Sequence, residues 1–570
     1  MPRHRDLHLL CAALLAPALL AAQATRPAPR LDPASRRQID ALFHDQDKPD
    51  VPGCALGVLR NGQLAYGRGY GAADLERHIP ITTATLFDIG STSKQFAAAS
   101  IALLAEEHKL SFDDEVRKYI PELPDYGAPL TIDNLMRHTS GLRDYAGLLA
   151  LAGHSLEEVT TDSQALAIIV HQRKLNFPTG SRYSYSNTGF FLLSVIVRRV
   201  SGMPLADFAR TRIFLPLGMT RTQYRNHFAM LIPNRALGYA PDSTGKGFRN
   251  SMSNWEQTGD GALHISIDDI RKWDENFYHP RVGGATMVAE LQQRGTLTNG
   301  DSISYARGLF VGTYRGLRRI EHGGDWIGYH AAYARFPAQH TSIVLLCNSD
   351  GISPDHLGEK VADIVLAKSF TQAKATLATN THATPATAAT LPTSALVGSY
   401  LAPTTDDVIR ISAKDGAPAL GFVGQSFVMV PSGASTFAIK GLPVTVTFES
   451  AGDSAAKSLW LRIGSSDSIA AERFAPATPS PEELRAFAGR YTSPELGVTW
   501  QIAFDKDHLE LDNARSDLMD IAGKLQPAMT DAFTAGGGTL QFVRGKDGRV
   551  TGMQLSASRM RGIQFDRVEP

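Results

Sequence analysis

The stretch "LFDIGSTSKQFAAASIALLAEE", residues 86–107, places Ser91 and Lys94 three positions apart where an extended segment turns into a long helix. At this spacing the two side chains share a helix face, and the N–H of Ser91 lies at the positive helix N-terminus. A lysine kept neutral by burial can take the serine proton, and the serine N–H can help bind the resulting oxyanion. A serine helix cap beside a solvated lysine gives the same pattern. This stretch alone fits both alternatives equally well.

A second motif lies in "NFPTGSRYSYSNTGFFLLSVIVRRVSG", residues 176–202, where Tyr185 and Asn187 directly precede an amphipathic helix. A phenol beside a Ser/Lys pair can relay a proton to a leaving group, and an amide can hold both the lysine and a substrate carbonyl. A core tyrosine and an asparagine helix cap are the ordinary alternative. The motif therefore shifts the balance toward a hydrolytic site without excluding a structural role.

The third motif is His322-Gly323-Gly324 in "RRIEHGGDWIGYHAAYARFP", residues 318–337. Glycines at the end of a strand let a ligand approach the backbone closely. A lone histidine, however, is more often a structural residue than a catalytic one. The residues alone leave the role of this motif open.

Several other patterns narrow the chemistry by their context or their absence. Two more Ser-x-x-Lys matches, Ser243/Lys246 and Ser454/Lys457, lie in polar loops where we expect no reaction. The sequence has no His-Glu-x-x-His, which disfavours a metallohydrolase, and no Gly-x-Ser-x-Gly, which disfavours an α/β-hydrolase. We expect a site that uses neither a metal nor a cofactor.

The composition is that of a globular protein with an export signal. The 570 residues are 43% hydrophobic, and 57 basic residues balance 57 acidic ones, so the chain offers no field for nucleic acid. The start, "MPRHRDLHLLCAALLAPALLAAQA", combines a basic end, an apolar run and a small-x-small cleavage site. The run is shorter than the roughly 20 residues that span a bilayer. We interpret residues 1–24 as a signal peptide, with a retained anchor as the alternative, and expect a periplasmic or secreted protein without a stable membrane span.

Hydropathy patterns divide the rest of the chain. Hairpin signals, including Asn61-Gly62, surround a helical middle, which predicts an antiparallel sheet packed by helices. A Thr/Ala/Pro-rich segment then indicates a linker. Two similar units follow, in which Tyr400 and Tyr491, and Phe474 and Phe565, share an offset of 91 residues. The predicted divisions are a signal peptide, a large domain, a linker and two β-barrel units: 1–24, 31–370, 371–392, 393–476 and 480–570.

Together the three motifs resemble the serine β-lactamase and penicillin-binding protein superfamily, which carries Ser-x-x-Lys, Tyr-x-Asn and Lys- or His-x-Gly in this order. Flanking segments such as "GALHISIDDIRKW", residues 261–273, are similar too, and the resemblance covers roughly residues 35–368. It is nearest to the class C-like branch of esterases, DD-peptidases and D-aminopeptidases, and the two-unit tail looks like that of the D-aminopeptidases. There a loop from the tail helps shape the pocket.

The resemblance implies an α+β fold, with a five-stranded antiparallel sheet flanked by helices, a helical subdomain and two small antiparallel barrels. It also implies that Cys54 and Cys347 fall on neighbouring strands, although two buried thiols remain an alternative to a disulfide. The implied site has three catalytic residues and four substrate-binding ones. These are Ser91 as nucleophile, Lys94 as base and Tyr185 as proton relay, then Asn187, His322, Gly324 and Asp325, with the N–H groups of Ser91 and Asp325 as the oxyanion hole.

One departure concerns the third motif, where most β-lactamases carry Lys-Thr-Gly. His322 is expected to be a weaker, pH-dependent cation, which lowers the expected β-lactamase activity. The leading hypothesis is an exported serine hydrolase that forms an acyl-enzyme with small or short-peptide substrates: D-amino-acid peptides, cell-wall fragments or esters. The alternatives are a protein that is acylated for sensing without turnover, and a weak β-lactamase.

Overall fold

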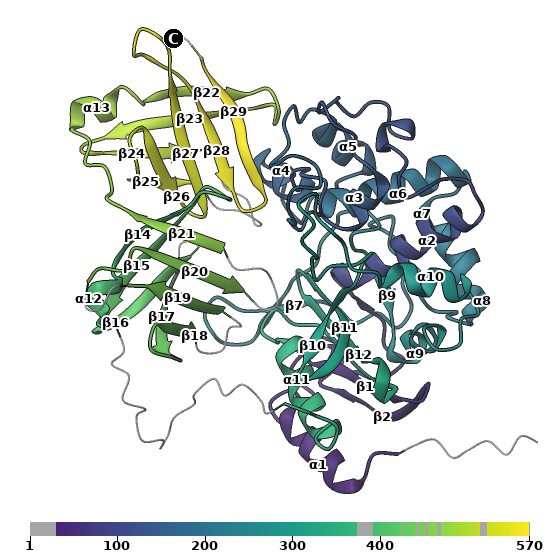
Figure 1. Ribbon diagram of the computed structural model, residues 1–570. Coiled ribbons are helices and arrows are strands. Elements are labelled where there is room, and N and C mark those ends of the chain that lie inside the picture. Colours follow the sequence, from purple (N-terminus) through teal and green to yellow (C-terminus); the bar gives the residue numbers. More distant parts are fainter. Residues whose placement is uncertain are drawn as a thin grey trace, which may run out of the picture.

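The computed structural model describes residues 30–372, 391–422, 425–439, 444–450, 454–463, 469–512 and 521–568. The predicted signal peptide and most of the predicted linker therefore lie outside the described residues. Figure 1 shows a large N-terminal domain with two β-barrels beside it, the second barrel (yellow) above the first (green). The predicted fold class and the two-barrel tail are both confirmed.

A six-stranded antiparallel sheet forms the centre of the N-terminal domain, one strand more than the expected five. Its order is β10-β11-β12-β13-β1-β2. The edge strand β10 pairs with β11 through a tight hairpin. The strands are β1 (Cys54–Arg60), β2 (Gln63–Tyr70), β10 (Phe310–Tyr314), β11 (Leu317–Trp326), β12 (Tyr329–Phe336) and β13 (Thr341–Cys347).

The first and last of these strands in the sequence lie side by side and are covalently joined. Cys54 of β1 is directly opposite Cys347 of β13, and the two form a buried disulfide. The pairing that the resemblance left open is thereby settled in favour of a bond. At the other end of β1, Asn61 and Gly62 both have positive φ and make the predicted two-residue hairpin to β2.

Helices cover both faces of the sheet, because successive residues of a strand point to opposite sides. Helices α1 (Pro33–Leu42) and α11 (Pro354–Val365) pack on one face, and α2 (Lys94–Glu106) and α9 (Ile267–Asn276) lie on the other (Figure 1). Residues 94–104 of α2 are all buried, so this helix runs through the core. Above it lies the helical subdomain, with α3 (Ile132–Met136), α4 (Tyr145–Leu151), α5 (Asp162–Val170), α6 (Asn187–Ser201) and α7 (Leu205–Ala209).

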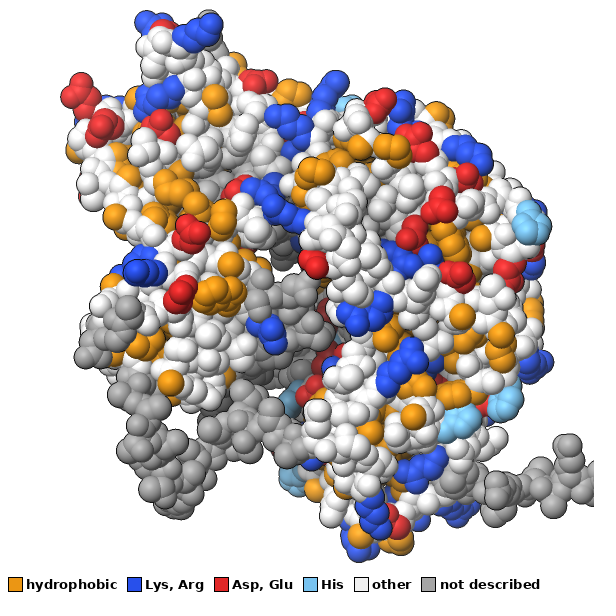
Figure 2. All heavy atoms as spheres, viewed as in Figure 1, with side chains coloured by type: hydrophobic (Ala, Val, Ile, Leu, Met, Phe, Trp, Pro, Cys, Tyr) orange, Lys and Arg blue, Asp and Glu red, His pale blue; other side chains and the backbone are white. Residues whose placement is uncertain are grey.

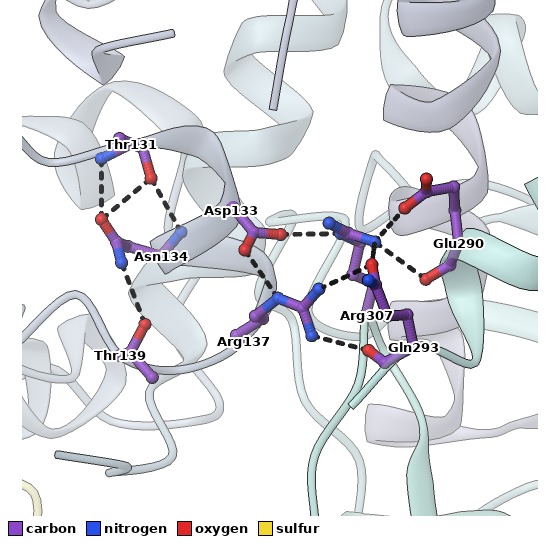
Figure 3. A network of polar contacts seen from close by, with 8 residues as sticks. All are labelled: Thr131, Asp133, Asn134, Arg137, Thr139, Glu290, Gln293 and Arg307. Atoms are coloured by element: carbon purple, nitrogen blue, oxygen red, sulfur yellow. Dashed lines mark hydrogen bonds and ion pairs between the residues drawn. The ribbon is translucent and has the colours of Figure 1, made fainter. Parts of the chain in front are cut away.

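A network of polar contacts joins α3 of the helical subdomain to α10 (Gly284–Leu291) and to the segment before β10 (Figure 3). Asp133 of α3 accepts hydrogen bonds from Arg137 Nε at 2.6 Å and from Arg307 Nε at 2.7 Å. Arg307 also pairs with Glu290 of α10. The next residue, Gly308, lies so close to α2 that a Cβ there would be 2.9 Å from the Cα of Gln95. The network therefore fixes the chain that packs directly behind Lys94.

The tail consists of two closed eight-stranded barrels. The first contains β14 (Gly398–Ala402), β15 (Asp407–Lys414), β16 (Ala417–Phe422), β17 (Gln425–Pro431), β18 (Thr436–Ile439), β19 (Val444–Glu449), β20 (Ser458–Ile463) and β21 (Ile469–Phe474). The second contains β22 (Gly489–Ser493), β23 (Val498–Asp505), β24 (His508–Asp512), β25 (Gly523–Pro527), β26 (Ala532–Ala535), β27 (Gly538–Arg544), β28 (Val550–Ala557) and β29 (Met560–Val568).

The internal repeat is confirmed at one pair of residues and corrected at another. Tyr400 and Tyr491 are both buried, and each hydroxyl donates to the carbonyl four residues earlier. Phe474 and Phe565, however, are not equivalent. In the barrel closure Tyr400 pairs with Arg473 and Tyr491 with Arg567, an offset of 94. The second unit is three residues longer between its first and last strands, a difference that the end motifs alone did not reveal.

Within the described residues, no single helix is long and apolar enough to cross a membrane. Taken together, the helical segments Asn187–Ser201 and Leu205–Leu217 are long and apolar enough by length and composition alone, but they are bent by 75° relative to each other.

Candidate active site

The predicted nucleophile lies on a short turn that leads into the core helix. Residues Gly90–Ser93 form a 3-10 turn, η1, directly before α2. Gly90 has a φ of +46°, and its N–H donates to the buried carboxylate of Asp88 at 2.8 Å. A residue with a side chain would be strained here, because this φ is rarely adopted by L-residues. The turn presents the partly exposed Ser91 one helical turn before Lys94.

The Lys94 amino group is fully buried and surrounded by three oxygen atoms. Its Nζ lies 3.0 Å from Ser91 Oγ, 2.9 Å from Asn187 Oδ1 and 2.8 Å from the carbonyl oxygen of Asp260. Burial lowers the pKa of Lys94 to about 7, against the opposing charges of Asp260 and Asp144. A neutral amine has two N–H donors and one lone pair. With the donors directed at the amide and the carbonyl, the lone pair faces the Ser91 hydroxyl.

Asn187 is held in place by the start of its own helix. It is the first residue of α6, and its N–H donates to Asp144 Oδ2 at 2.7 Å. Asp144 in turn caps α4 by accepting from the N–H groups of Ala146 and Gly147. One carboxylate thus joins the N-termini of two helices, which is the favourable place for a negative charge. The side-chain amide of Asn187 is thereby aimed at Lys94.

Tyr185 lies between three charged or aromatic side chains. Its ring centroid is 4.9 Å from Lys94 Nζ and 4.7 Å from the guanidinium carbon of Arg559, and it packs on the His138 ring at 4.1 Å. Its buried hydroxyl has no hydrogen-bond partner among the residues that the structure describes. Burial raises the pKa of Tyr185, while the nearby Ser91 hydroxyl and the charge of Arg559 oppose the rise. The phenol is therefore adjacent to the nucleophile and available to a ligand.

The third motif runs alongside the nucleophile turn, and its glycine is required by that contact. A Cβ at Gly324 would lie 1.9 Å from the carbonyl oxygen of Ile89, so only glycine lets β11 approach the turn this closely. Thr92 Oγ1 donates to the His322 carbonyl at 3.1 Å. A Cβ at Gly90 would be 2.9 Å from the backbone nitrogen of Asp325. The two segments that carry the predicted oxyanion hole are therefore neighbours, and Gly324 serves packing between them.

His322 differs from the expected pH-dependent cation. Its side chain is only 2% exposed, its Nδ1 lies 2.6 Å from the Gly323 carbonyl oxygen, and its Nε2 lies 2.9 Å from the Tyr305 hydroxyl. The carbonyl can only accept, so Nδ1 carries the proton and Nε2 accepts from the tyrosine. Burial, with a contribution from Lys94, lowers the pKa of His322 to about 3. The imidazole is neutral at pH 7 and holds β11 against Tyr305.

Four residues of the site were missed by sequence reasoning: Asp144, His138, Asp260 and Arg559. Asp260 meets Lys94 through its main-chain carbonyl, which carries no residue signature, while its Oδ2 accepts from Tyr145 at 2.9 Å. Burial raises the pKa of the Asp260 carboxyl, and the charge of Lys94 opposes the rise. Asp144 had one signal, an Asp directly before an apolar helical run, which is typical of a helix cap.

The comparison with protein families agrees with this geometry. The model described as "Beta-lactamase" matches residues 39–368, which is more than half of the chain. The chain belongs to the beta-lactamase family. It is thus a serine hydrolase, as predicted from the three motifs. Residues 473–567 match a second model, "Domain of unknown function (DUF3471)", which covers the second barrel.

Curated relatives are similar over the N-terminal domain. "Penicillin-binding protein 4*" of Bacillus subtilis is 29% identical over 332 residues, covering 55% of this chain and 72% of the relative. The "D-aminopeptidase" of Gluconobacter oxydans is 31% identical over 297 residues, covering 52% of this chain and 56% of the relative. The match thus spans little more than half the length of that D-aminopeptidase.

A solved structure shows the fold beyond the N-terminal domain. The octameric penicillin-binding protein homologue from Pyrococcus abyssi has a TM-score of 0.56 at 21% identity, and the match covers 77% of this chain and 99% of that one. At this identity the likeness concerns the fold alone. It extends beyond the share of the chain that the family model matches.

Proposed function

We propose that the chain is an exported hydrolase that cleaves amide or ester bonds of small substrates through an acyl-enzyme on Ser91. The observation that carries the proposal is the position of Lys94 Nζ, which is buried within hydrogen-bonding distance of Ser91 Oγ, Asn187 Oδ1 and the Asp260 carbonyl. Two acceptors for the N–H donors of a neutral amine leave its lone pair for the serine proton. A solvated lysine beside a serine helix cap would be exposed to water and would not require these three oxygen contacts.

The proposed reaction begins when Ser91 Oγ attacks the substrate carbonyl and its proton passes to Lys94. The N–H groups of Ser91 and Asp325 stabilise the oxyanion. Tyr185 relays this proton from Lys94 to the leaving amine or alcohol, the bond to the leaving group breaks, and an ester to Ser91 remains, with Lys94 neutral again. Water then attacks this ester, gives up a proton to the same base system and releases the acid with Ser91 restored.

The substrate class is proposed from the relatives. The relatives include D-aminopeptidases and a penicillin-binding protein. Accordingly we propose D-amino-acid peptides, cell-wall fragments or small esters as substrates. Export is supported by the composition of residues 1–24 and by the Cys54–Cys347 disulfide, because such bonds persist in oxidising compartments such as the periplasm.

The test compares the mature protein with Ser91→Ala on two substrates, D-alanine p-nitroanilide and a short-chain p-nitrophenyl ester. The matched control is Ser243→Ala, which removes the exposed serine of another Ser-x-x-Lys sequence. We expect Ser91→Ala to lower kcat on the preferred substrate by about 10³-fold or more, and Ser243→Ala to leave it unchanged. Anilide cleavage that rivals ester cleavage supports an aminopeptidase, and ester cleavage alone supports an esterase.

The alternative without turnover gives a different result in the same preparation. A protein that is acylated for sensing would show one Ser91-dependent mass adduct per chain and no steady-state product with either substrate. That outcome contradicts the proposed hydrolase. Export is tested separately by expression of the full chain in a Gram-negative host, where cleavage after Ala24 predicts a periplasmic protein that begins at Thr25.

A further inference from the structure

The turn between β28 and β29 of the second barrel places one arginine at the active site. Arg559 lies on this turn, and its guanidinium carbon is 4.7 Å from the centroid of the Tyr185 ring. Its Nη1 is 3.8 Å from Asp144 Oδ2. Arg559 is separated from Tyr185 by several hundred residues of sequence, so only the docking of the barrel brings the two together.

The backbone of this turn is hydrogen-bonded to the N-terminal domain at Arg559 and at the residues that follow it, Arg561 and Gly562. The side-chain amide of Asn176 donates to the Arg559 carbonyl at 2.8 Å and accepts from the Arg561 N–H at 2.8 Å. Arg143 donates from Nε to the Arg561 carbonyl at 2.9 Å and from Nη2 to the Gly562 carbonyl at 3.0 Å. The position of Arg559 relative to the site is therefore built into the docking contact. Figure 2 shows Lys and Arg side chains along the border where the tail meets the N-terminal domain.

The guanidinium N–H groups of Arg559 are available to a ligand. None of them donates a hydrogen bond to a residue that the structure describes, and the side chain is 46% exposed. At 3.8 Å the contact with Asp144 is an ion pair without a hydrogen bond, and the oxygens of Asp144 already accept from the N–H groups of residues 146, 147 and 187. Five donors in a planar fork fit a carboxylate bidentately.

Among the described side chains, neither the base nor the histidine of the third motif offers a positive charge to a substrate, and the nearby His330 is already paired with Asp325 and Asp350. Lys94 must be neutral to act as the base, and His322 is buried and neutral. Among the described residues in contact with the Tyr185 ring, Lys94 and Arg559 are the cations. Since Tyr185 faces the leaving group in the proposed reaction, Arg559 above the same ring is on the leaving-group side.

We propose that Arg559 binds a carboxylate on the leaving-group side of the substrate, so that the second barrel sets a preference for short peptides that end in a free carboxylate. This inference rests on the proposed function, because the leaving-group side is defined by that reaction. The tail then supplies the cation that the third motif of this chain does not provide.

The test measures two matched peptides as competitors of p-nitrophenyl ester hydrolysis, so it works whether or not the peptides are cleaved. The probes are N-acetyl-D-alanyl-D-alanine and the same peptide with a C-terminal carboxamide. The enzymes are the wild type, Arg559→Gln, Arg559→Lys and the control Arg549→Gln, which alters an arginine side chain that is 87% exposed. The readout is the ratio of the two inhibition constants, because any effect of Arg559 on the pKa of Lys94 cancels in this ratio.

We expect the wild type to prefer the carboxylate, and Arg559→Gln to lower this preference by about 10- to 100-fold, as for the loss of hydrogen bonds to a charged group. Arg559→Lys should keep part of the preference, and Arg549→Gln all of it. The proposal is overturned if the wild type does not discriminate, if neither peptide competes, or if Arg559→Gln weakens both peptides equally. A wild-type enzyme that shows no Ser91-dependent ester hydrolysis is a distinct result, and it contradicts the proposed function itself.

Discussion

Glu495→Gln tests whether one buried charge pair holds the second barrel on the N-terminal domain. Glu495 Oε1 accepts from Arg143 Nη1 at 3.0 Å and from the Arg173 N–H at 2.9 Å, and the side chains of Arg143 and Glu495 are only 1% and 7% exposed. Removing one partner of a buried ion pair costs about 3–5 kcal/mol, because the remaining charge has no counter-charge. Glutamine keeps an acceptor for Arg173, so we expect a loss near the lower end, about 3 kcal/mol.

The assay is calorimetric unfolding of the full chain at fixed pH, since a protein of several domains has no single unfolding free energy. The matched control is Asp547→Asn, which removes an exposed pair with Arg549 and should cost less than about 1 kcal/mol. We expect the temperature of the first unfolding transition to fall clearly for Glu495→Gln and not for Asp547→Asn. We also expect Glu495→Gln to weaken the preference for the peptide carboxylate that Arg559 provides. If the two variants unfold alike, the charge pair contributes nothing net and the reasoning is refuted.

Three further predictions concern the site and the sheet. The value of kcat/KM for a neutral ester should rise with pH through about 7 as Lys94 loses its proton. Asp260→Asn should move this rise to lower pH, because the Asp260 carboxylate raises the pKa of Lys94. A pH–rate series on both enzymes checks the two expectations. Gly324→Ala should lower kcat/KM by about 100-fold, whereas Gly312→Ala, where an added Cβ meets nothing within 4 Å, should not; steady-state assays separate them. Replacing both residues of the Cys54–Cys347 bridge by alanine should cost up to about 5 kcal/mol, seen as a lower melting temperature, and an unchanged melting temperature would contradict a stabilising bond.

Much of the fold followed from local patterns. The Asn61-Gly62 turn, the buried helix after Ser91 and the strands around His322 were predicted from alternation, helical spacing and turn chemistry. These signals are local, so each can be recognised in a short window. The resemblance implied a sheet of five strands, whereas the structure has six, with the short β10 at one edge.

The site was predicted only as far as its chemistry lies in side-chain motifs. Asp260 binds Lys94 through a carbonyl that any residue could supply, so no residue type marks the position. Arg559 reaches the site through the docking of a separate barrel, which no pattern near Tyr185 can indicate. The charge state of His322 depends on its burial against Tyr305, and the sequence shows the histidine without showing what surrounds it.

The bond between Cys54 and Cys347 has a consequence for damaged enzyme. The bridge encloses residues 55–346, a span that contains all three motifs and the highly exposed Leu231. A protease that cuts the chain at Leu231 would leave Ser91 and His322 on different fragments, but the fragments would stay one covalent molecule. Such a nicked enzyme runs at full mass on a gel without reductant and separates into two bands only after reduction. The tether also keeps the two halves at a high effective concentration, so a cut in this loop need not end activity.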